Sequence, residues 1–460
     1  MTEQRRERGE RKGGGFGARR LCATLAAPAL AALCLLSPGA SREGASAVSG
    51  PPAHEPRAAV AAEDGGPGLL LPPPLEGGFG APAAGLSPAP AAGLSPAQGA
   101  AGVNDRRVYP EPPAPRLPAA GGTFRDPAFG AEVMRVTDER DGAGCGNFYP
   151  HWPTLNADST RLLVRRQERG DAVYEFDPAA FRLGRARPVP RLPDNGVLIT
   201  EGAIWSPRDP NVLYGATFNG PYLWALDVSR QTYRLVKDFS REPGFRKGDY
   251  LWQMSVSADE DVFAFTHRDA SYKPVGHAVW RRSDDRLLVN SDSTVEDEVR
   301  LDKSGRYLVR YLSRQVRGFD CFVQDLRTGR EEGLTPDAPD FSPGHGDVGA
   351  GMLVAWDNND NRFLRRALSD PHRFTAVLEM GRDWMNQHLS LLSRDDAWAL
   401  VTFYSYRGQG LAPGLFHDEL VLVKTDGSGQ FRRLLQHRSK AQDYWAMPRA
   451  NISYDGRFAA

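Results

Sequence analysis

Short apolar runs alternate with polar turns through most of this chain, and one kind of turn recurs at a nearly fixed interval. A small polar residue is followed within three positions by Asp or Gly, and a short apolar run comes next. These turns begin at Asn156, Ser206, Ser257, Asp302, Ser393 and Ser453. The first four are 50, 51 and 45 residues apart, and the 91 residues from Asp302 to Ser393 leave room for two repeats. A strand-rich repeat of this length predicts a β-propeller, in which four-stranded blades surround a central channel.

The second repeat displays the strands of one blade. Apolar runs at 212–214, 222–226 and 233–236 are separated by turns rich in Asn, Gly, Pro and Asp. Runs this short, with β-branched and aromatic residues, are typical of strands, and no stretch keeps a helical period. We therefore predict an all-β fold of about seven blades, with six as the alternative.

The last predicted blade is incomplete, because the sequence stops inside what should be its second strand. The segment Ala131–Thr137 has the pattern of a fourth strand. We expect it to pair with the strand near Phe458 and so close the ring with both ends of the chain, which removes free strand edges. On this pattern the chain looks like a fragment or has an atypical end.

The first 117 residues differ in composition from the rest. Residues 1–47 begin with several arginines, continue with an apolar stretch at 21–36 and end with Ala45, Ser46 and Ala47, which predicts a secretory signal. An uncleaved membrane anchor is the alternative, although the stretch is short and broken by Pro28. Residues 48–117 are rich in Pro, Ala and Gly, which predicts a disordered tether. The propeller then occupies 118–460 of an exported protein, either periplasmic or extracellular.

The balance of charged residues limits the classes of partner that we expect. The 57 basic and 57 acidic side chains cancel, which argues against nucleic acid or an anionic membrane surface as a partner. We expect no membrane span in the mature chain, and a monomer.

Only Cys145 and Cys321 follow the signal segment, and the repeat order puts them nearly across the ring. A disulfide needs Cα atoms within about 7 Å, so we predict two free thiols.

The ring geometry points to one set of candidate functional residues. The loop entering each innermost strand lies at one mouth of the channel, so the position five residues before each turn is equivalent from blade to blade. This position and its neighbours carry the predicted ligand-binding residues, which are His151, Glu201, Gln253, Asp297, Glu298, His345, Asp347, His388 and Arg449.

These side chains have the chemistry of a metal or anion site. His345 and His388 at the ring position, with His417 from a loop expected at the same mouth, are the candidate metal ligands, because imidazoles with a carboxylate are the ligand set for Zn, Mn and similar ions. We expect any divalent metal there to be Mn, Zn or Ca. Arg449 can clamp a carboxylate, and the carboxyl groups can act as bases. The competing interpretation is that these groups line a channel and hydrogen bond to one another and to water.

The turns themselves carry a family resemblance. Ser257-Ala258-Asp259 and Ser453-Tyr454-Asp455-Gly456, each before an apolar run, resemble the repeats of TolB-type, PD40-like propellers, a group that includes the oligogalacturonate lyases. Resemblance to those lyases implies a propeller that uses a divalent metal to split uronate oligosaccharides by β-elimination. Their metal motif has no residue-by-residue match here, so no catalytic residue is transferred.

Two functions follow from these observations. The first is an exported propeller that binds a small polar or carbohydrate ligand, or a protein partner, at the channel mouth. The second is a metal-dependent polysaccharide lyase. The arrangement of the histidines at the mouth distinguishes them.

Overall fold

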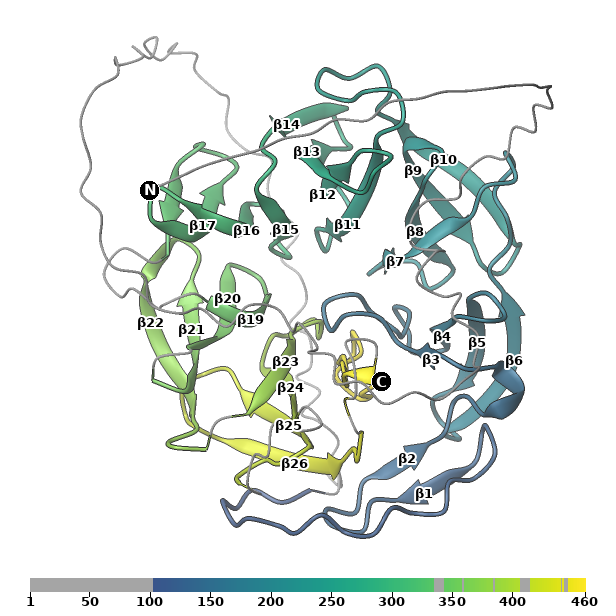
Figure 1. The fold of residues 1–460 in the computed structure, drawn as a ribbon, viewed down its shortest axis with the longest axis vertical. Helices are drawn as coiled ribbons and strands as arrows, with labels where there is room; N and C mark the ends of the chain where they lie inside the picture. The colour runs from purple at the N-terminus through teal and green to yellow at the C-terminus, as the bar shows by residue number, and fades with distance from the viewer. Residues whose placement is uncertain are drawn as a thin grey trace, which may run out of the picture. The chain divides into compact units, whose positions relative to one another are not determined.

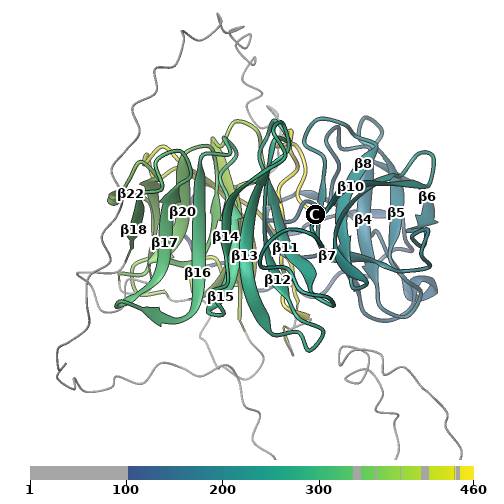
Figure 2. The same ribbon diagram turned by 90° about the horizontal axis from the view of Figure 1, so that it is seen from above.

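The computed structural model describes residues 102–334, 343–357, 360–383, 385–405, 414–439, 441 and 446–460. In these residues the fold is a β-propeller of six four-stranded antiparallel sheets around a central axis (Figure 1). Within each blade the strands follow one another in chain order, from the channel outward. Figure 2 shows the strands side by side, running roughly along the axis. The all-β class predicted from the repeat is confirmed.

The first three blades contain the following strands. Blade 1 consists of β3 (Cys145–Gly146), β4 (Arg161–Arg166), β5 (Ala172–Asp177) and β6 (Arg182–Pro188). Blade 2 consists of β7 (Leu198–Trp205), β8 (Val212–Thr217), β9 (Gly220–Asp227) and β10 (Thr232–Asp238). Blade 3 consists of β11 (Tyr250–Val256), β12 (Val262–Arg268), β13 (Pro274–Arg281) and β14 (Arg286–Ser291).

The other three blades repeat this plan. Blade 4 consists of β15 (Glu296–Leu301), β16 (Tyr307–Val316), β17 (Phe319–Asp325) and β18 (Glu331–Gly333). Blade 5 consists of β19 (Pro343–Val348), β20 (Met352–Asp357), β21 (Arg362–Ala367) and β22 (Asp370–Glu379). Blade 6 consists of β23 (Asn386–Ser390), β24 (Trp398–Tyr404), β25 (Glu419–Lys424) and β26 (Phe431–Gln436).

The described residues do not form a seventh four-stranded blade, so six, the alternative count, is what the structure has. The C-terminal segment lies between blades 6 and 1 in Figure 1 and hydrogen bonds to both. Ile452 donates to Ser390 Oγ at 3.2 Å, and Thr154 donates to Asn451 Oδ1 at 3.2 Å. Its own pairing is a single bridge between Ile452 and Ala459.

The segment that follows β1 (Thr123–Arg125) and the C-terminal segment meet through side chains. The strand β2 (Glu132–Met134) pairs with β1 in a two-stranded sheet, not with the segment near Phe458 as expected. Met134, Val136 and Phe458 nevertheless pack against one hydrophobic cluster of blade 1. The ring is therefore closed at this point by apolar contact.

The recurring turn has a structural explanation. The Ser257 hydroxyl lies 2.5 Å from Asp259 Oδ1 and accepts the Val262 amide at 3.0 Å, and Ser453 makes the equivalent bonds. The polar residue therefore satisfies the first amide of the next strand. The fourth turn residue has positive φ, 74° at Gly305 and 71° at Gly456, which explains the preference for Gly and Asp there.

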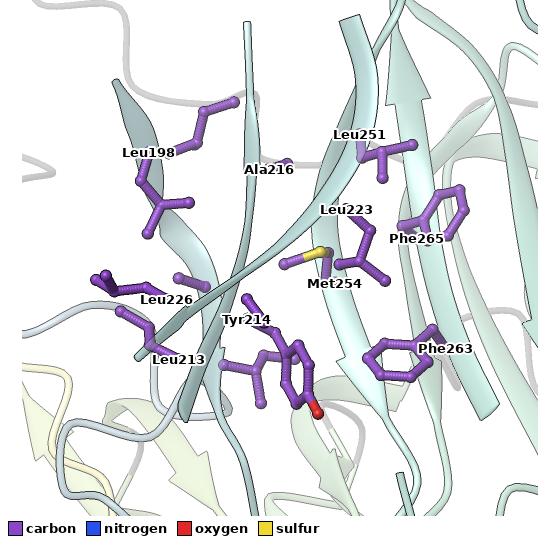
Figure 3. Close-up of a cluster of buried hydrophobic side chains, with 14 of the residues drawn as sticks. Leu198, Leu213, Tyr214, Ala216, Leu223, Leu226, Leu251, Met254, Phe263 and Phe265 are labelled. Atoms are coloured by element: carbon purple, nitrogen blue, oxygen red, sulfur yellow. The ribbon is translucent and has the colours of Figure 1, made fainter. Parts of the chain in front are cut away.

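The core lies between blades and is largest around blades 2 and 3. Leu213, Leu226, Phe263 and Phe265 pack there at 1% exposure or less (Figure 3). Alternate residues of each strand face one neighbour, as period-two sequences require. Trp205 is fully buried and donates its indole N–H to Thr154 O at 3.1 Å, which joins blade 2 to blade 1.

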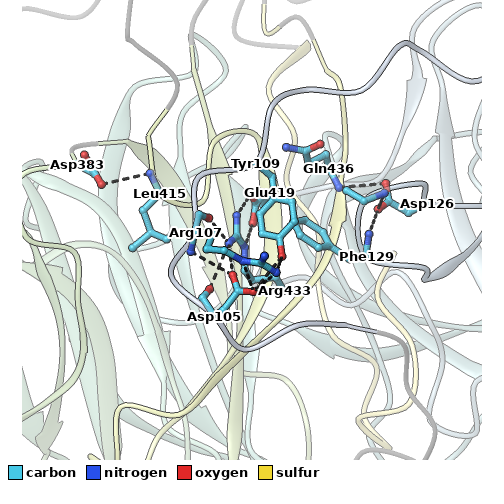
Figure 4. A network of polar contacts seen from close by, with 11 residues as sticks. Asp105, Arg107, Tyr109, Asp126, Phe129, Asp383, Leu415, Glu419, Arg433 and Gln436 are labelled. Atoms are coloured by element: carbon cyan, nitrogen blue, oxygen red, sulfur yellow. Dashed lines mark hydrogen bonds and ion pairs between the residues drawn. The ribbon is translucent and has the colours of Figure 1, made fainter.

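A segment before β1 covers the outer edge of blade 6. Val103 bridges Arg433 of β26, and the Arg433 guanidinium donates to Arg107 O at 2.6 Å (Figure 4). Such covering protects an edge strand from pairing with other chains. Val103 and Arg107, which belong to the predicted tether at 48–117, therefore contact blade 6. The predicted signal at 1–47 and most of the predicted tether lie outside the described residues.

Two further expectations concern the cysteines and membranes. Cys145 and Cys321 are both free thiols, as their places in the ring predict, and Cys321 is buried. In the described part of the chain, no helix is long and apolar enough to cross a membrane.

Candidate functional site

The candidate site lies at the mouth where the innermost strands begin, here called the start mouth. The strands β7, β11, β15, β19 and β23 bring Glu201, Gln253, Glu298, His345 and His388 to the channel. The opposite end, where these strands run into the recurring turns, is here called the turn mouth. Propeller geometry gives each blade one innermost strand, so residues from distant parts of the sequence meet around the axis.

A buried ionic network crosses the channel between blades 1, 4 and 5. His151 Nε2 lies 2.7 Å from Glu298 Oε1, and Glu298 accepts Arg300 Nε at 2.7 Å and Nη2 at 3.0 Å. Arg300 also donates to Gly346 O and lies 3.8 Å from Asp347 Oδ1. Burial by itself raises the pKa of Glu298, but the charges of Arg300 and His151 outweigh it and hold the pKa below its usual value. Glu298 is therefore ionised and held in place.

Two imidazoles from neighbouring blades stack at this mouth. The rings of His345 and His388 have centroids 4.8 Å apart and planes 29° apart. His345 Nδ1 lies 2.9 Å from Gln387 O, and His388 Nδ1 lies 2.9 Å from Pro448 O. Because a carbonyl only accepts, each Nδ1 carries the proton and each Nε2 keeps its lone pair. The Nε2 atom of His388 is buried with no hydrogen-bond partner.

The surrounding protein favours the neutral form of both rings. It lowers the pKa of His388 well below its usual value, and the charge of His345 lowers it further. His345 retains an exposed surface, but the protein packed around the mouth lowers its pKa as well. A neutral imidazole with a lone pair on Nε2 is the form that binds a metal ion or accepts a proton.

These imidazoles fit part of a divalent-metal site. The structure does not group His417 with His345 and His388: its Nε2 lies 3.5 Å from Asp418 Oδ2, and its charge acts on His437. No group of three or more His, Cys, Asp or Glu side chains among the described residues is arranged to hold a metal ion. Among the described side chains, the His345–His388 pair therefore presents two imidazole nitrogens and no complete set of metal ligands.

Two carboxyl groups at the mouth have raised pKa values, whereas the pKa of Glu298 is lowered. Burial raises the pKa of Glu201. Asp297 has an exposed surface, but the protein packed around the mouth and the Glu298 charge raise its pKa as well. Arg268, at the end of β12, acts electrostatically on both groups and partly offsets these rises. A carboxyl group with a raised pKa can take up a proton nearer neutral pH, which suits a general base.

Arginines and aromatic rings line the rim beside these carboxyl groups. The Arg268 guanidinium lies 4.4 Å from the ring centroid of Tyr272 and donates to Tyr272 O at 3.1 Å. Phe218 is 37% exposed and Tyr272 40% exposed, and each packs edge-on against a buried aromatic residue, Tyr250 and Trp252 respectively. On the other side of the mouth, Arg449 lies 4.9 Å from the Tyr149 ring centroid. Two exposed rings therefore lie at this mouth, and Arg268 and Arg449, each 7% exposed, lie beneath its surface.

The remaining predicted residue, Gln253, also lies at this mouth. It has a positive φ of 51°, and its amide oxygen is 3.2 Å from Thr266 Oγ1. Its backbone nitrogen lies against Gly202 of blade 2, where a Cβ would approach to 3.1 Å. The close approach of these two segments brings blades 2 and 3 together beside Glu201.

Sequence reasoning missed Arg268, Arg300 and the exposed ring of Phe218. Arg268 is paired with Tyr250, at the end of the second strand of blade 3. In an antiparallel pair the end of the second strand lies beside the beginning of the first. The end of the second strand of a blade therefore lies at the start mouth, and this rule could have identified Arg268 from the sequence. It also applies to Phe218, which follows the end of β8.

Comparison with known proteins supports the fold. An oligogalacturonate lyase in complex with manganese has a TM-score of 0.55 at 14% identity, over 75% of this chain and 92% of that one. The oligogalacturonate lyase of Vibrio parahaemolyticus has a TM-score of 0.53 at 11% identity, over 74% and 94%. A TolB structure from Agrobacterium tumefaciens is more distant, with a TM-score of 0.34 at 14% identity over 50% and 81%.

No family model matches the chain, and no curated protein matches it either. The resemblance that the turns indicated is confirmed for the fold by the two oligogalacturonate lyase structures.

Proposed function

We propose that the start mouth binds a small polar ligand, and that the ligand is a carbohydrate bearing a carboxylate. The observation that carries this proposal is the rim formed by Arg268 with the exposed rings of Phe218 and Tyr272. Aromatic faces pack against the apolar face of a sugar ring, while a guanidinium holds a carboxylate through two parallel hydrogen bonds. Arg449 and Arg165 add positive potential around Glu201, which favours an anionic ligand further.

The other mouth residues have definite roles in this proposal. Glu201 and Asp297 accept hydrogen bonds from sugar hydroxyls. The His151–Glu298–Arg300 network forms the floor beneath the ligand, since its members are ion-paired with one another. A protein partner remains the second kind of ligand, and it would need a contact area far larger than this mouth.

Calorimetric titration with trigalacturonate and with the neutral galactose trimer tests the proposal. Trigalacturonate should bind and the neutral trimer should bind at least tenfold more weakly, because a charge-assisted bond contributes about 1.5–3 kcal/mol. Arg268→Gln should weaken trigalacturonate binding about tenfold. Arg286→Gln, on the outer strand β14, is the matched control and should bind normally. Equal affinity for the two trimers would contradict the proposal.

A metal-dependent lyase is the second candidate, favoured by the stacked His345–His388 pair. A divalent ion bound to the two Nε2 atoms would supply Lewis acidity to a uronate carboxylate. The chain's own contribution would be to hold the sugar with Arg268 and to accept the proton at Asp297 or Glu201, whose pKa values are raised. Mn, Zn and Ca are the ions to test.

Metal analysis of the purified protein, followed by an assay for unsaturated uronate products, separates the two candidates. Bound metal with product formation that disappears in His345→Gln supports the lyase. Trigalacturonate binding without metal and without product supports a binding protein.

Export remains part of the proposal, and it rests on the pattern of residues 1–47. N-terminal sequencing of the mature protein from the expressing cells tests it. A start near residue 48 is expected, and retention of Met1 would contradict it.

A further inference from the structure

A cavity lies at the turn mouth, the end of the channel opposite the start mouth. A cavity of about 400 Å³ is lined at one end by His151, Glu298 and Asp347 and at the other by Arg208 and Arg394. Its volume is within the range of pockets that bind small molecules. The residues around it at the turn mouth, including Arg208, Ser304 and Arg394, are exposed, while Arg300 and Asp347 at its inner end are buried. The cavity therefore opens at the turn mouth and ends at the ionic network.

The wall of the cavity is mainly apolar. Ile204, Met254, Leu301 and Val348 line it from four successive blades, and each is less than 7% exposed. These side chains are the inward-facing residues of the innermost strands just before the recurring turns. An apolar wall of this kind favours a ligand whose buried part is hydrocarbon.

The opening is cationic. Four cations line the cavity, Arg208, Arg300, Lys303 and Arg394, against two carboxylates, Glu298 and Asp347. Arg300 is paired with Glu298, and Lys303 is paired with Asp396. This leaves Arg208 and Arg394 as the charges that determine the potential at the opening.

The two arginines bond to neutral acceptors. Arg394 Nη2 donates to Ala157 O at 2.8 Å and Pro207 O at 3.1 Å, and Arg208 Nη1 donates to Asp259 O at 3.1 Å. Neither belongs to an ion pair among the described residues. Two nearby acidic residues, Asp259 and Asp395, accept hydrogen bonds from backbone amides of their own turns. Two guanidinium groups at the opening of an apolar cavity are suited to an anionic head group.

We propose that this cavity binds an anionic amphiphile, with its hydrocarbon part along the inner strands and its carboxylate, sulfonate or phosphate on Arg394 and Arg208. The site goes beyond the function proposed for the start mouth and does not depend on it, because the His151–Glu298–Arg300 network separates the two.

Calorimetry on the full chain with three probes of equal chain length tests the proposal. Octanoate should bind, octanol should bind at least tenfold more weakly, and octyltrimethylammonium should not bind. Saturation with trigalacturonate should leave octanoate binding unchanged, which distinguishes this site from the start mouth. Absence of octanoate binding at millimolar concentration, or equal binding of the cationic probe, would overturn the proposal.

Variants place the site in the cavity. Arg394→Gln should weaken octanoate about tenfold and leave octanol unchanged. Val256→Trp should fill the cavity and abolish binding of both. Because Arg394 joins three parts of the ring, Arg208→Gln, an exposed residue with one backbone bond, provides a second charge test if Arg394→Gln does not fold. Arg286→Gln is the control. Unchanged octanoate affinity in the folded charge variants would refute the role of these arginines.

Discussion

The imidazole of His345 stacks on that of His388 with ring centroids 4.8 Å apart, and each ring is oriented by a backbone carbonyl on Nδ1. The rings belong to β19 and β23, from adjacent blades. With Nδ1 occupied in both rings, the two Nε2 atoms are the ones that can bind a metal ion or accept a proton. It also makes the two histidines different in their contribution to folding, because His388 is 1% exposed and His345 is on the surface of the mouth.

His345→Gln should remove metal affinity while leaving the free energy of unfolding within about 0.5 kcal/mol, as is usual for exposed positions. His388→Ala should also remove metal affinity, but should destabilise the protein by about 2 kcal/mol or more, since it leaves a cavity against Tyr404. Manganese titration and urea unfolding measure the two effects. If His345→Gln retains full metal affinity, the stacked pair is not a metal site.

Stability should fall as the pH drops below about 6.5. Loss of hydration in the fold lowers the pKa of His267, His388 and His437, and also that of His345 at the surface of the mouth, below the value in the unfolded chain. Between the unfolded pKa and the lower folded values, the unfolded state binds protons that the folded state does not, so acid favours unfolding. Urea unfolding at pH 7.5 and pH 5.5 measures the loss.

His267→Gln should reduce that loss, because one of the four groups is removed. His372→Gln is the matched control, since the His372 side chain is 45% exposed and lies near Glu332, on the outermost strands of blades 5 and 4. An unfolding free energy that is the same at both pH values would show that the buried histidines are not neutral in the fold.

The propeller could be predicted from the sequence because each blade repeats the same strands joined by the same kind of turn. Ser257 and Ser453 recur because a hydroxyl at the turn must satisfy the first amide of the next strand. The same periodicity placed His345 and His388 at one mouth, where the structure stacks them. Such positions follow from strand register alone.

Other parts of the site depend on contacts that register does not specify. The loop before β25 passes through positive φ at Phe416 and Asp418, so strand alternation gives no direction for His417. The pairing of His151 with Glu298 joins blades 1 and 4 across the channel, and the number of blades decides which residues face each other there. The blade count was itself open, because the residues after Ser453 are too few to show whether another blade forms.

Arg433→Met should destabilise the protein by about 3–5 kcal/mol, because it leaves the buried Glu419 carboxylate without its partner. Arg433 donates to Glu419 at 2.7 and 2.5 Å, and both side chains are at most 1% exposed. The double variant with Glu419→Leu should recover part of the loss. Arg230→Met, which breaks an exposed pair with Asp227, should change stability by less than about 1 kcal/mol. Chemical denaturation measures all three, and equal effects of Arg433→Met and Arg230→Met would contradict the argument.

Gly305→Ala should cost more than Gly329→Ala, although both glycines have φ of 74°. The left-handed conformation costs an alanine about 1 kcal/mol at either position. At Gly305 the added Cβ would also lie 3.1 Å from Ser257 Cβ and from Val262 Cγ2 of the neighbouring blade, whereas at Gly329 nothing lies within 4 Å. The extra cost at Gly305 therefore reports packing between the turns of blades 3 and 4. Thermal and urea unfolding of the two variants give the comparison. A Gly329→Ala variant as unstable as Gly305→Ala would mean that the backbone conformation alone, and not contact between blades, makes glycine necessary in the recurring turn.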